Sequence, residues 1–191
     1  LFYAITTGDN QAAQNALSYG ANPDADAGKS HTMLTYALEM DRTEIARMLL
    51  TKGVQVDKQT SAGYTPLAIA AKFGRDAMVA ELLARGANPN LATDRGYTPL
   101  MLAAMNGHAA TIKMLLEKRA DADLTTNGGE SAYDIAQKIG NPELSAALKA
   151  AMKSAPRRSI IARVHSAYRL ASSTRLAGNI FFILRLQMDT R

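Results

Sequence analysis

The sequence predicts an all-α solenoid of stacked helix-turn-helix units, followed by a C-terminal tail of different composition. A local pattern around Gly63 returns 33 residues later at Gly96 and again at Gly129. Within each period, apolar residues recur at spacings of three and four, which is typical of amphipathic helices. A unit of this length cannot bury its apolar stripe alone, so we expect neighbouring units to cover it.

The clearest copies of the repeat are two nine-residue blocks. Residues 63–71 and residues 96–104 share Gly-Tyr-Thr-Pro-Leu at the start and Ala-Ala at the end, and they match at seven of nine positions. The blocks that begin at Ser30 and Gly129 keep the apolar residues and lack the Thr-Pro. The period predicts a partial first unit, three full units, a closing unit and a tail, with these bounds: 1–29, 30–62, 63–95, 96–128, 129–152 and 153–191.

The third unit shows how each helix is specified locally. Thr65 can accept a hydrogen bond from a free backbone N–H at the start of the first helix, and Pro66 follows where no donor is needed. Gly74 comes about two turns later, where a positive φ lets the chain reverse. A second helix is predicted over 76–84, and residues 86–89, Gly-Ala-Asn-Pro, end it with turn chemistry.

The other units follow the same plan with local differences. Thr98, Pro99 and Gly107 repeat the signals of the third unit in the fourth. The chain begins at Leu1, at the third residue of the motif, so we interpret the sequence as a fragment or processed form. The last unit is predicted to close the stack, with its polar groups on the face that no sixth unit covers: Glu143, Ser145 and Lys149.

A 33-residue period that carries Thr-Pro-Leu and then Ala-Ala resembles the ankyrin repeat. Over about residues 1–152, the chain is similar to a bacterial-type ankyrin domain of about five repeats. It implies two antiparallel helices per unit, β-hairpin loops between units and a protein-binding role. The chain departs from the family where Ala68 and Met101 replace the histidine that usually follows Thr-Pro-Leu, and where Gly-His survives only as Gly107-His108.

The resemblance also implies which residues lie on the concave, partner-binding surface. In the third and fourth units, the expected partner-binding residues are Tyr64, Lys72, Phe73, Asp94, Arg95, Tyr97, Met105 and Asn106. The same mapping adds flanking positions in the second to fifth units: Lys29, His31, Glu39, Met40, Ser61, Ala62, Asn127, Glu130, Lys138 and Ile139. Aromatic anchors among mixed charges suit a protein interface. The alternative for Phe73 and Met105 is packing on a neighbouring helix.

The formal charge of +5 is concentrated in the tail. Residues 1–153 hold 15 Lys and Arg against 16 Asp and Glu, whereas residues 154–191 hold 7 Arg against one Asp. The repeats therefore lack the basic surface that nucleic-acid binding requires. No apolar run approaches the roughly 18 residues of a membrane span.

No catalytic or metal-binding constellation is found in the sequence. There is no cysteine, and the three histidines are dispersed, at positions 31, 108 and 165. His108 is interpreted as a residue that bonds local backbone after a helix-ending glycine. Gly128-Gly129 lacks the Gly-Lys-Ser/Thr ending of a phosphate loop, and Asp121 and Asp123 are interpreted as turn residues. We therefore expect no enzyme activity, no metal and no cofactor.

The leading hypothesis is a monomeric, non-catalytic module that binds a protein partner, in either the cytoplasm or an exported location. The alternative is an adaptor that attaches to an anionic membrane or nucleic acid through a helix in the tail, with a basic face of Arg157, Arg158, Arg163 and Arg169. The tail could equally be a disordered extension or sequence foreign to the natural protein. Its composition alone leaves these interpretations open.

Overall fold

The computed structural model describes residues 1–28 and 31–154, and this part of the chain is an all-α solenoid. Its elements confirm the predicted fold class and run as follows: α1 (Phe2–Thr7), α2 (Asn10–Ser18), α3 (Met33–Glu39), α4 (Thr43–Thr51), α5 (Pro66–Lys72), α6 (Asp76–Ala84), α7 (Pro99–Met105), α8 (Ala109–Glu117), α9 (Ala132–Ile139) and α10 (Pro142–Ser154).

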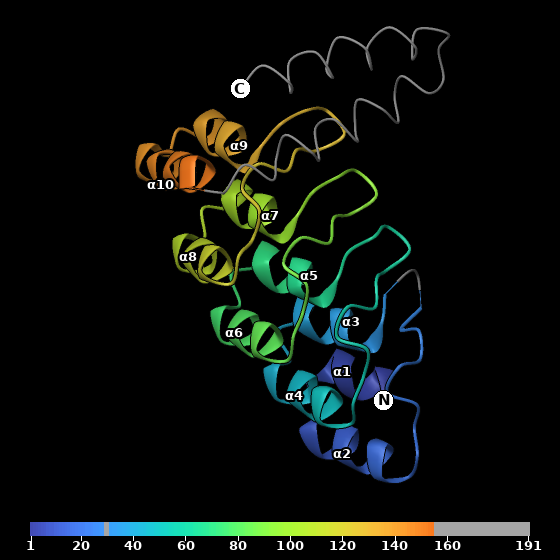
Figure 1. Cartoon of the computed structure of the whole chain (residues 1–191). Coiled ribbons are helices and arrows are strands. Elements are labelled where there is room, and N and C mark those ends of the chain that lie inside the picture. Colours follow the sequence, from blue (N-terminus) through green and yellow to red (C-terminus); the bar gives the residue numbers. More distant parts are fainter. Residues whose placement is uncertain (29–30, 155–191) are drawn as a thin grey trace, which may run out of the picture. The chain divides into compact units, whose positions relative to one another are not determined.

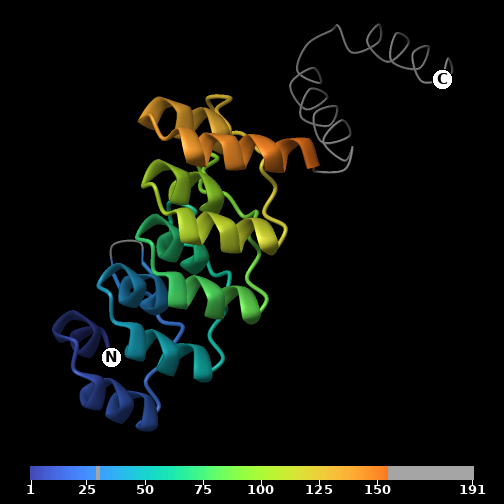
Figure 2. The same cartoon turned by 90° about the vertical axis from the view of Figure 1, so that its left-hand side faces the viewer.

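The helices form two layers, and the loops between units form a third region beside them. In Figure 1, the odd-numbered helices make the layer next to the loops, and the even-numbered helices make the layer on the far side. Figure 2 shows the same helix pairs stacked in chain order. The core lies between these layers, and the paired alanines that recur in the motif are fully buried there: Ala70, Ala71, Ala103 and Ala104. Their small side chains let neighbouring helices approach closely.

The predicted helix starts are confirmed. Thr65 Oγ1 accepts a hydrogen bond from Ala68 N at 3.0 Å, and Thr98 Oγ1 accepts one from Met101 N at 3.3 Å. The second helix of the third unit spans Asp76–Ala84, as its sequence predicted.

The degenerate outer copies of the motif also begin with capped helices. Thr32 and Ser131 each form a capping box at the start of α3 and α9, with Thr35 and Asp134 as the reciprocal partners. Loss of the Thr-Pro pair therefore leaves the cap in place, because a Ser or Thr hydroxyl is the group that satisfies the free N–H groups.

Chain reversal after each first helix uses a left-handed backbone, as predicted for Gly74 and Gly107, whose φ angles are 62° and 71°. The corresponding residue of the second unit is Asp41, which adopts φ 57° without being glycine. A second exception closes α8, where Arg119 has φ 63° at a position that earlier units fill with glycine.

The loops between units are hairpins without regular strands in the described residues. One closing backbone hydrogen bond recurs at each period, from Ala27 N to His31 O, Thr60 N to Tyr64 O, Thr93 N to Tyr97 O and Thr126 N to Glu130 O, at 2.7 to 2.9 Å. In the last three hairpins, the threonine hydroxyl also accepts the N–H of the residue that closes the loop.

Successive loops are tied together by a second recurring bond. A side-chain oxygen in one unit accepts a backbone N–H from the next, as Gln55 N to Asp24, Asn88 N to Asp57 and Asp121 N to Asn90, at 2.8 to 3.3 Å. We call this series the loop ladder. It satisfies backbone donors in the loops that follow the second helices and links each repeat to its neighbour.

The closing helix α10 corrects one expectation about the cap. Glu143 and Lys149 are exposed as expected, but Ser145 is buried, with 8 % of its surface exposed. Its hydroxyl donates to Asn141 O at 2.7 Å. Ser145 lies directly after the buried Leu144, and its bond to the helix backbone satisfies the polar group without water.

Candidate functional site

The candidate site is the surface where the first helices end beside the hairpin loops, and we call it the hairpin face. It comprises one hairpin residue per unit and the two residues that end each first helix: His31, Glu39, Met40, Tyr64, Lys72, Phe73, Tyr97, Met105, Asn106, Glu130, Lys138 and Ile139. In three units, the side chain of the hairpin residue contacts the side chain eight positions later, near the end of the first helix. His31 Nε2 lies 2.9 Å from Glu39 Oε2, Lys72 lies over Tyr64, and Lys138 forms an ion pair with Glu130.

The third unit brings three of the expected site residues into one cluster. The Lys72 ammonium lies 5.7 Å from the Tyr64 ring centroid and 5.1 Å from that of Phe73. At these distances both rings attract the cation through their π faces. Both rings are half-buried and pack against the core, so they are held in position by the fold.

The fourth unit continues this surface with a more apolar composition. Tyr97 is half-buried against the core, whereas Met105 keeps 41 % of its surface exposed. The packing alternative therefore describes Phe73 better than Met105. Asn106 ends α7, and its Nδ2 donates to Leu102 O at 2.9 Å. Within the described residues, neither the Tyr64 nor the Tyr97 hydroxyl has a hydrogen-bond partner.

Asp94 and Arg95 lie at the hairpin tip of the third unit, away from the helix ends. Asp94 N donates to Ala62 O at 3.2 Å, and Asn127 donates from its N and Nδ2 to the Arg95 and Asp94 carbonyl oxygens. The two charged side chains are exposed. Their backbones join neighbouring hairpins, so these residues have a structural role in addition to any contact with a partner.

An aromatic extension of the face was missed at the sequence level. Tyr36 stacks on Phe2 with ring centroids 5.1 Å apart, and His31 meets Tyr36 edge-on at 6.1 Å. The residues one and two periods after Tyr36 are Ile69 and Leu102, which are buried in the core. The repeat register thus aligns Tyr36 with core positions, and a tyrosine at an otherwise aliphatic position was the signal that could have revealed this extension.

His108 corrects a second expectation. Its Nε2 lies 3.1 Å from Lys72 O in the preceding unit, whereas the sequence suggested a bond to local backbone. Arg42 occupies the equivalent position two units earlier and donates to Ile5 O and Thr6 O. This position therefore links a unit to the carbonyl oxygens that end the previous first helix, and in the third unit it fixes the backbone beneath Lys72.

In the fifth unit, the hairpin face combines an ion pair with the exposed side chain of Ile139. The hydrogen bond from Lys138 to Glu130 and the charge of that carboxylate raise the pKa of the Lys138 ammonium above its ordinary value. The Lys138 ammonium is thus held in its charged form beside Glu130.

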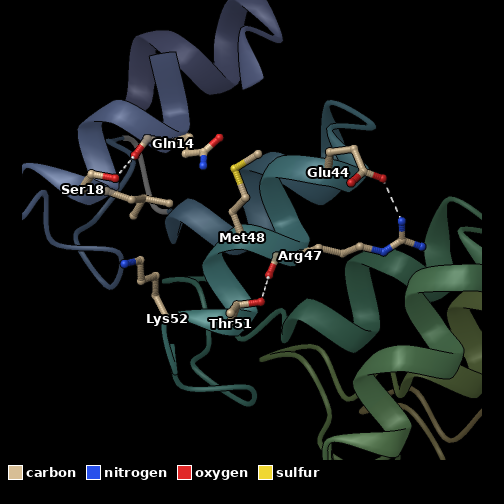
Figure 3. Close-up of a pocket in the computed structure, with 8 residues that line it drawn as sticks. Gln14, Ser18, Glu44, Arg47, Met48, Thr51 and Lys52 are labelled. Atoms are coloured by element: carbon tan, nitrogen blue, oxygen red, sulfur yellow. Dashed lines mark hydrogen bonds and ion pairs between the residues drawn. The ribbon is translucent and has the colours of Figure 1, made fainter. Parts of the chain in front are cut away.

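Two shallow grooves lie on the opposite layer, between second helices. One of about 340 Å³ is shown in Figure 3, with Gln14 and Ser18 on α2 facing Met48 on α4 and Lys52 directly after it. The other, of about 380 Å³, lies between α8 and α10 and is lined mainly by apolar side chains such as Ile112 and Leu144.

Arg47 borders the α2–α4 groove and joins it to the third unit. Its guanidinium donates to Glu81 at 3.2 Å and to Glu44 at 2.7 Å. The bond to Glu81, followed by the charge of Glu44, raises the pKa of Arg47 above its ordinary value. The positive charge is therefore already satisfied by two carboxylates of the protein.

Within residues 1–28 and 31–154, no three acidic or histidine side chains gather where they could hold a metal ion. None of the helices in this part of the chain is long and apolar enough to cross a membrane. The predicted basic face of the tail, Arg157, Arg158, Arg163 and Arg169, lies outside the described residues.

Comparison with known families gives two matches. The family described as "Ankyrin repeats (3 copies)" matches residues 1–93, and the family described as "Ankyrin repeats (many copies)" matches residues 82–136. The two matches overlap and together extend over residues 1–136. No curated protein matches the chain.

Proposed function

The chain belongs to the ankyrin-repeat family, whose repeats are in general protein–protein interaction modules, and on this premise we propose that it is a non-catalytic module that binds a protein partner on its hairpin face. The face lies on the layer of first helices, which we assign as the concave side of the stack. The observation that carries the proposal is the cluster of Tyr64, Lys72 and Phe73, continued by Tyr97 and Met105.

This cluster has the composition of a binding centre. Tyr64 and Tyr97 are anchored by the core, and each presents a hydroxyl that makes no hydrogen bond in the described part of the chain. A rigid tyrosine offers apolar area and a hydrogen bond at a small cost in side-chain entropy. Met105 adds exposed apolar surface that adapts to the shape of a partner.

The surrounding charges suit a polar rim. Glu130 is paired with Lys138, and Glu39 with His31, on either side of the apolar centre. A centre of aromatic residues within a ring of charged side chains excludes water from the contacts that contribute most to affinity.

The grooves on the opposite layer are weaker candidates for the main site. Arg47, the cation beside the α2–α4 groove, is already bonded to Glu44 and Glu81, so a ligand would have to compete with both carboxylates. The residues that line this groove provide the control surface for the experiment below.

The test compares the full chain with Tyr64→Ala/Tyr97→Ala and with the control Gln14→Ala/Lys52→Ala, whose exposed residues line the α2–α4 groove. A partner is captured from source lysate, identified by mass spectrometry and measured by titration calorimetry. Each tyrosine should contribute at least about 1 kcal/mol, so the double variant should raise the Kd at least about 30-fold. The control should leave the Kd within about twofold of the unmodified chain.

Circular dichroism and thermal melting show whether the tyrosine variant is folded at the measuring temperature. A folded tyrosine variant with unchanged affinity would contradict the assignment of the hairpin face, and loss of binding in the control would move the site to the groove.

A further inference from the structure

We propose that the hairpin face binds an extended acidic segment of its partner, with a carboxylate on Lys72 and an apolar side chain about three residues away on each side. The inference rests on the proposed function and specifies the chemistry of the partner. The juxtaposition that carries it is a lysine whose ammonium lies over two aromatic rings, with exposed methionines at the ends of the preceding and the following first helices.

The first step concerns charge. The hairpin-face carboxylates of the second and fifth units lie beside His31 and Lys138. Lys72 has no carboxylate within salt-bridge distance among the described residues, and its contacts are with the rings of Tyr64 and Phe73. An opposite charge from outside the chain is therefore the complement that this position lacks.

The second step concerns preorganisation. An exposed lysine loses rotamer freedom when it binds, which offsets much of the gain from an ion pair. Lys72 is half-buried, and the two rings already attract its ammonium to one position. A carboxylate that reaches its ammonium gains a charge-assisted hydrogen bond with less ordering of the protein.

The third step concerns spacing. Met40 directly follows α3 in the second unit and is 39 % exposed, and Met105 is the last residue of α7 in the fourth and is 41 % exposed. Packed helices lie about 8–10 Å apart, and an extended chain in the polyproline II conformation rises about 3.1 Å per residue with three residues per turn, so its side chains three residues apart lie on the same side. One repeat therefore corresponds to about three residues of an extended partner. A segment with Asp or Glu on Lys72 places apolar residues on both methionines when they follow at a spacing of three.

The electrostatics of the repeats favour a peptide carboxylate over a nucleic acid. Residues 1–153 carry 15 basic and 16 acidic residues, so a polyanion gains no long-range attraction to them. A single carboxylate between apolar residues interacts with Lys72 at short range, so its binding does not depend on a long-range attraction to the repeats.

The experiment selects a phage-displayed library of random 12-residue peptides on the full chain, on Lys72→Glu and on the control Lys113→Glu. Lys113 is an exposed lysine on α8, beside the groove on the opposite layer. The unmodified chain and the control should enrich Asp or Glu with apolar residues about three positions away. Lys72→Glu should enrich Lys or Arg at the same position. A synthetic acidic peptide from the first selection should bind Lys72→Glu at least about tenfold more weakly.

Each selected peptide is also titrated against Tyr64→Ala/Tyr97→Ala, and each variant is melted to confirm that it is folded. If Lys72→Glu does not fold, Lys72→Met replaces it and should abolish the acidic preference while apolar enrichment persists. Two outcomes overturn the acidic-segment inference and leave the hairpin-face assignment standing. In the first, the selected peptides need the tyrosines for binding but show no preference for Asp or Glu. In the second, they need the tyrosines but Lys72→Glu selects the same acidic residues as the unmodified chain. Peptides that bind independently of the tyrosines, or no enrichment at all, overturn it together with the hairpin-face assignment.

Discussion

Two residues adopt a left-handed backbone that equivalent positions in other units give to glycine. Arg119, with φ 63°, occupies the position that Gly20, Gly53 and Gly86 occupy in earlier units. Asp41, with φ 57°, occupies the position that Gly74 occupies one unit later. A residue with a Cβ pays about 1–2 kcal/mol for this conformation. Asp41 offsets part of the cost by an ion pair with Arg75 at 2.8 Å, whereas Arg119 is exposed and has no ion pair among the described residues.

Arg119→Gly should therefore stabilise the protein. We expect the free energy of unfolding to rise by about 0.5–1 kcal/mol, because relief of backbone strain exceeds the greater entropy of glycine in the unfolded chain. Urea denaturation at neutral pH measures the change. The matched control is Lys118→Gly, whose φ of −93° needs no glycine, and which should destabilise the protein. A loss of stability in Arg119→Gly would contradict the strain argument.

At this scale, the sequence predicted which residues cap and reverse the chain but not which residues contact the next unit. Thr65 and Gly74 act on backbone within a few residues, so their roles can be inferred locally. His108 bonds to Lys72 O and Lys72 lies over Phe73, and these contacts depend on how the helices pack. The expected site residues were named from repeat register, and their role in binding a partner stays a prediction.

The first helices of the second to fifth units begin at residues that the sequence makes predictable, because a Ser or Thr N-cap is a local signal. The second helix α6 has no side-chain cap, and its start is predictable from the preceding glycine and the apolar spacing. The α6 bounds, Asp76–Ala84, agree with prediction at both ends. The closing helix α10 was less predictable. Burial of Ser145 depends on which face of the last helix turns toward the core, and no later repeat exists in the described residues to define that register.

The start of α9 makes the stability of the closing unit depend on pH. The Ser131 hydroxyl and N–H donate to Asp134 at 2.5 and 2.8 Å, and the hydroxyl bond, followed by the backbone bond, lowers the pKa of Asp134 below its ordinary 3.8. A lowered pKa in the folded state means that the ionised carboxylate stabilises the fold above its unfolded pKa of about 4. That contribution is lost as the pH falls through the lower, folded value.

Asp134→Asn should therefore make the free energy of unfolding less dependent on pH in the acid range. At about pH 6 the variant should be less stable than the unmodified chain, and the difference should shrink as the pH falls below about 4. Urea denaturation at a series of pH values between these limits tests this. A stability difference that stays constant over the series would show that ionisation of Asp134 contributes nothing to the capping box.

Across the whole molecule, stability arises between neighbouring repeats, and the hairpins show this most directly. A Cβ at Gly63 would lie 2.7 Å from Asp94 N in the next hairpin, and one at Gly96 would lie 2.7 Å from Asn127 N. Gly129 has nearly the same backbone, with φ 83°, but a Cβ there meets nothing within 4 Å. The hairpin glycines thus differ only in whether another hairpin packs on them.

Gly63→Ala and Gly129→Ala form a matched pair that separates backbone strain from contact between repeats. Both substitutions place a Cβ at a positive φ, so Gly129→Ala should cost about 1 kcal/mol. Gly63→Ala should cost about 1–3 kcal/mol more, because Asp94 must move away from the added methyl group. Thermal and urea unfolding of both variants measure the difference, and equal losses would contradict close packing between the hairpins.

The family and the solenoid were predictable at this scale because one period organises caps, turns and core together. The loop ladder was not predicted, since its donors and acceptors lie about 31 residues apart. Only a structure shows that the carboxylate of one turn reaches the backbone of the next.

The loop ladder bears on how the number of repeats changes during evolution. Excision of residues 64–96 would join Gly63 to Tyr97 and recreate the Gly-Tyr-Thr-Pro sequence, and Asp57 would meet the N–H of Asp121 as it now meets that of Asn88. Insertion of a copied unit would extend the same pattern. Because successive loops are joined by the same bond, recombination can lengthen or shorten the chain by whole repeats without leaving a junction unbonded, and the length of the hairpin face changes in the same steps.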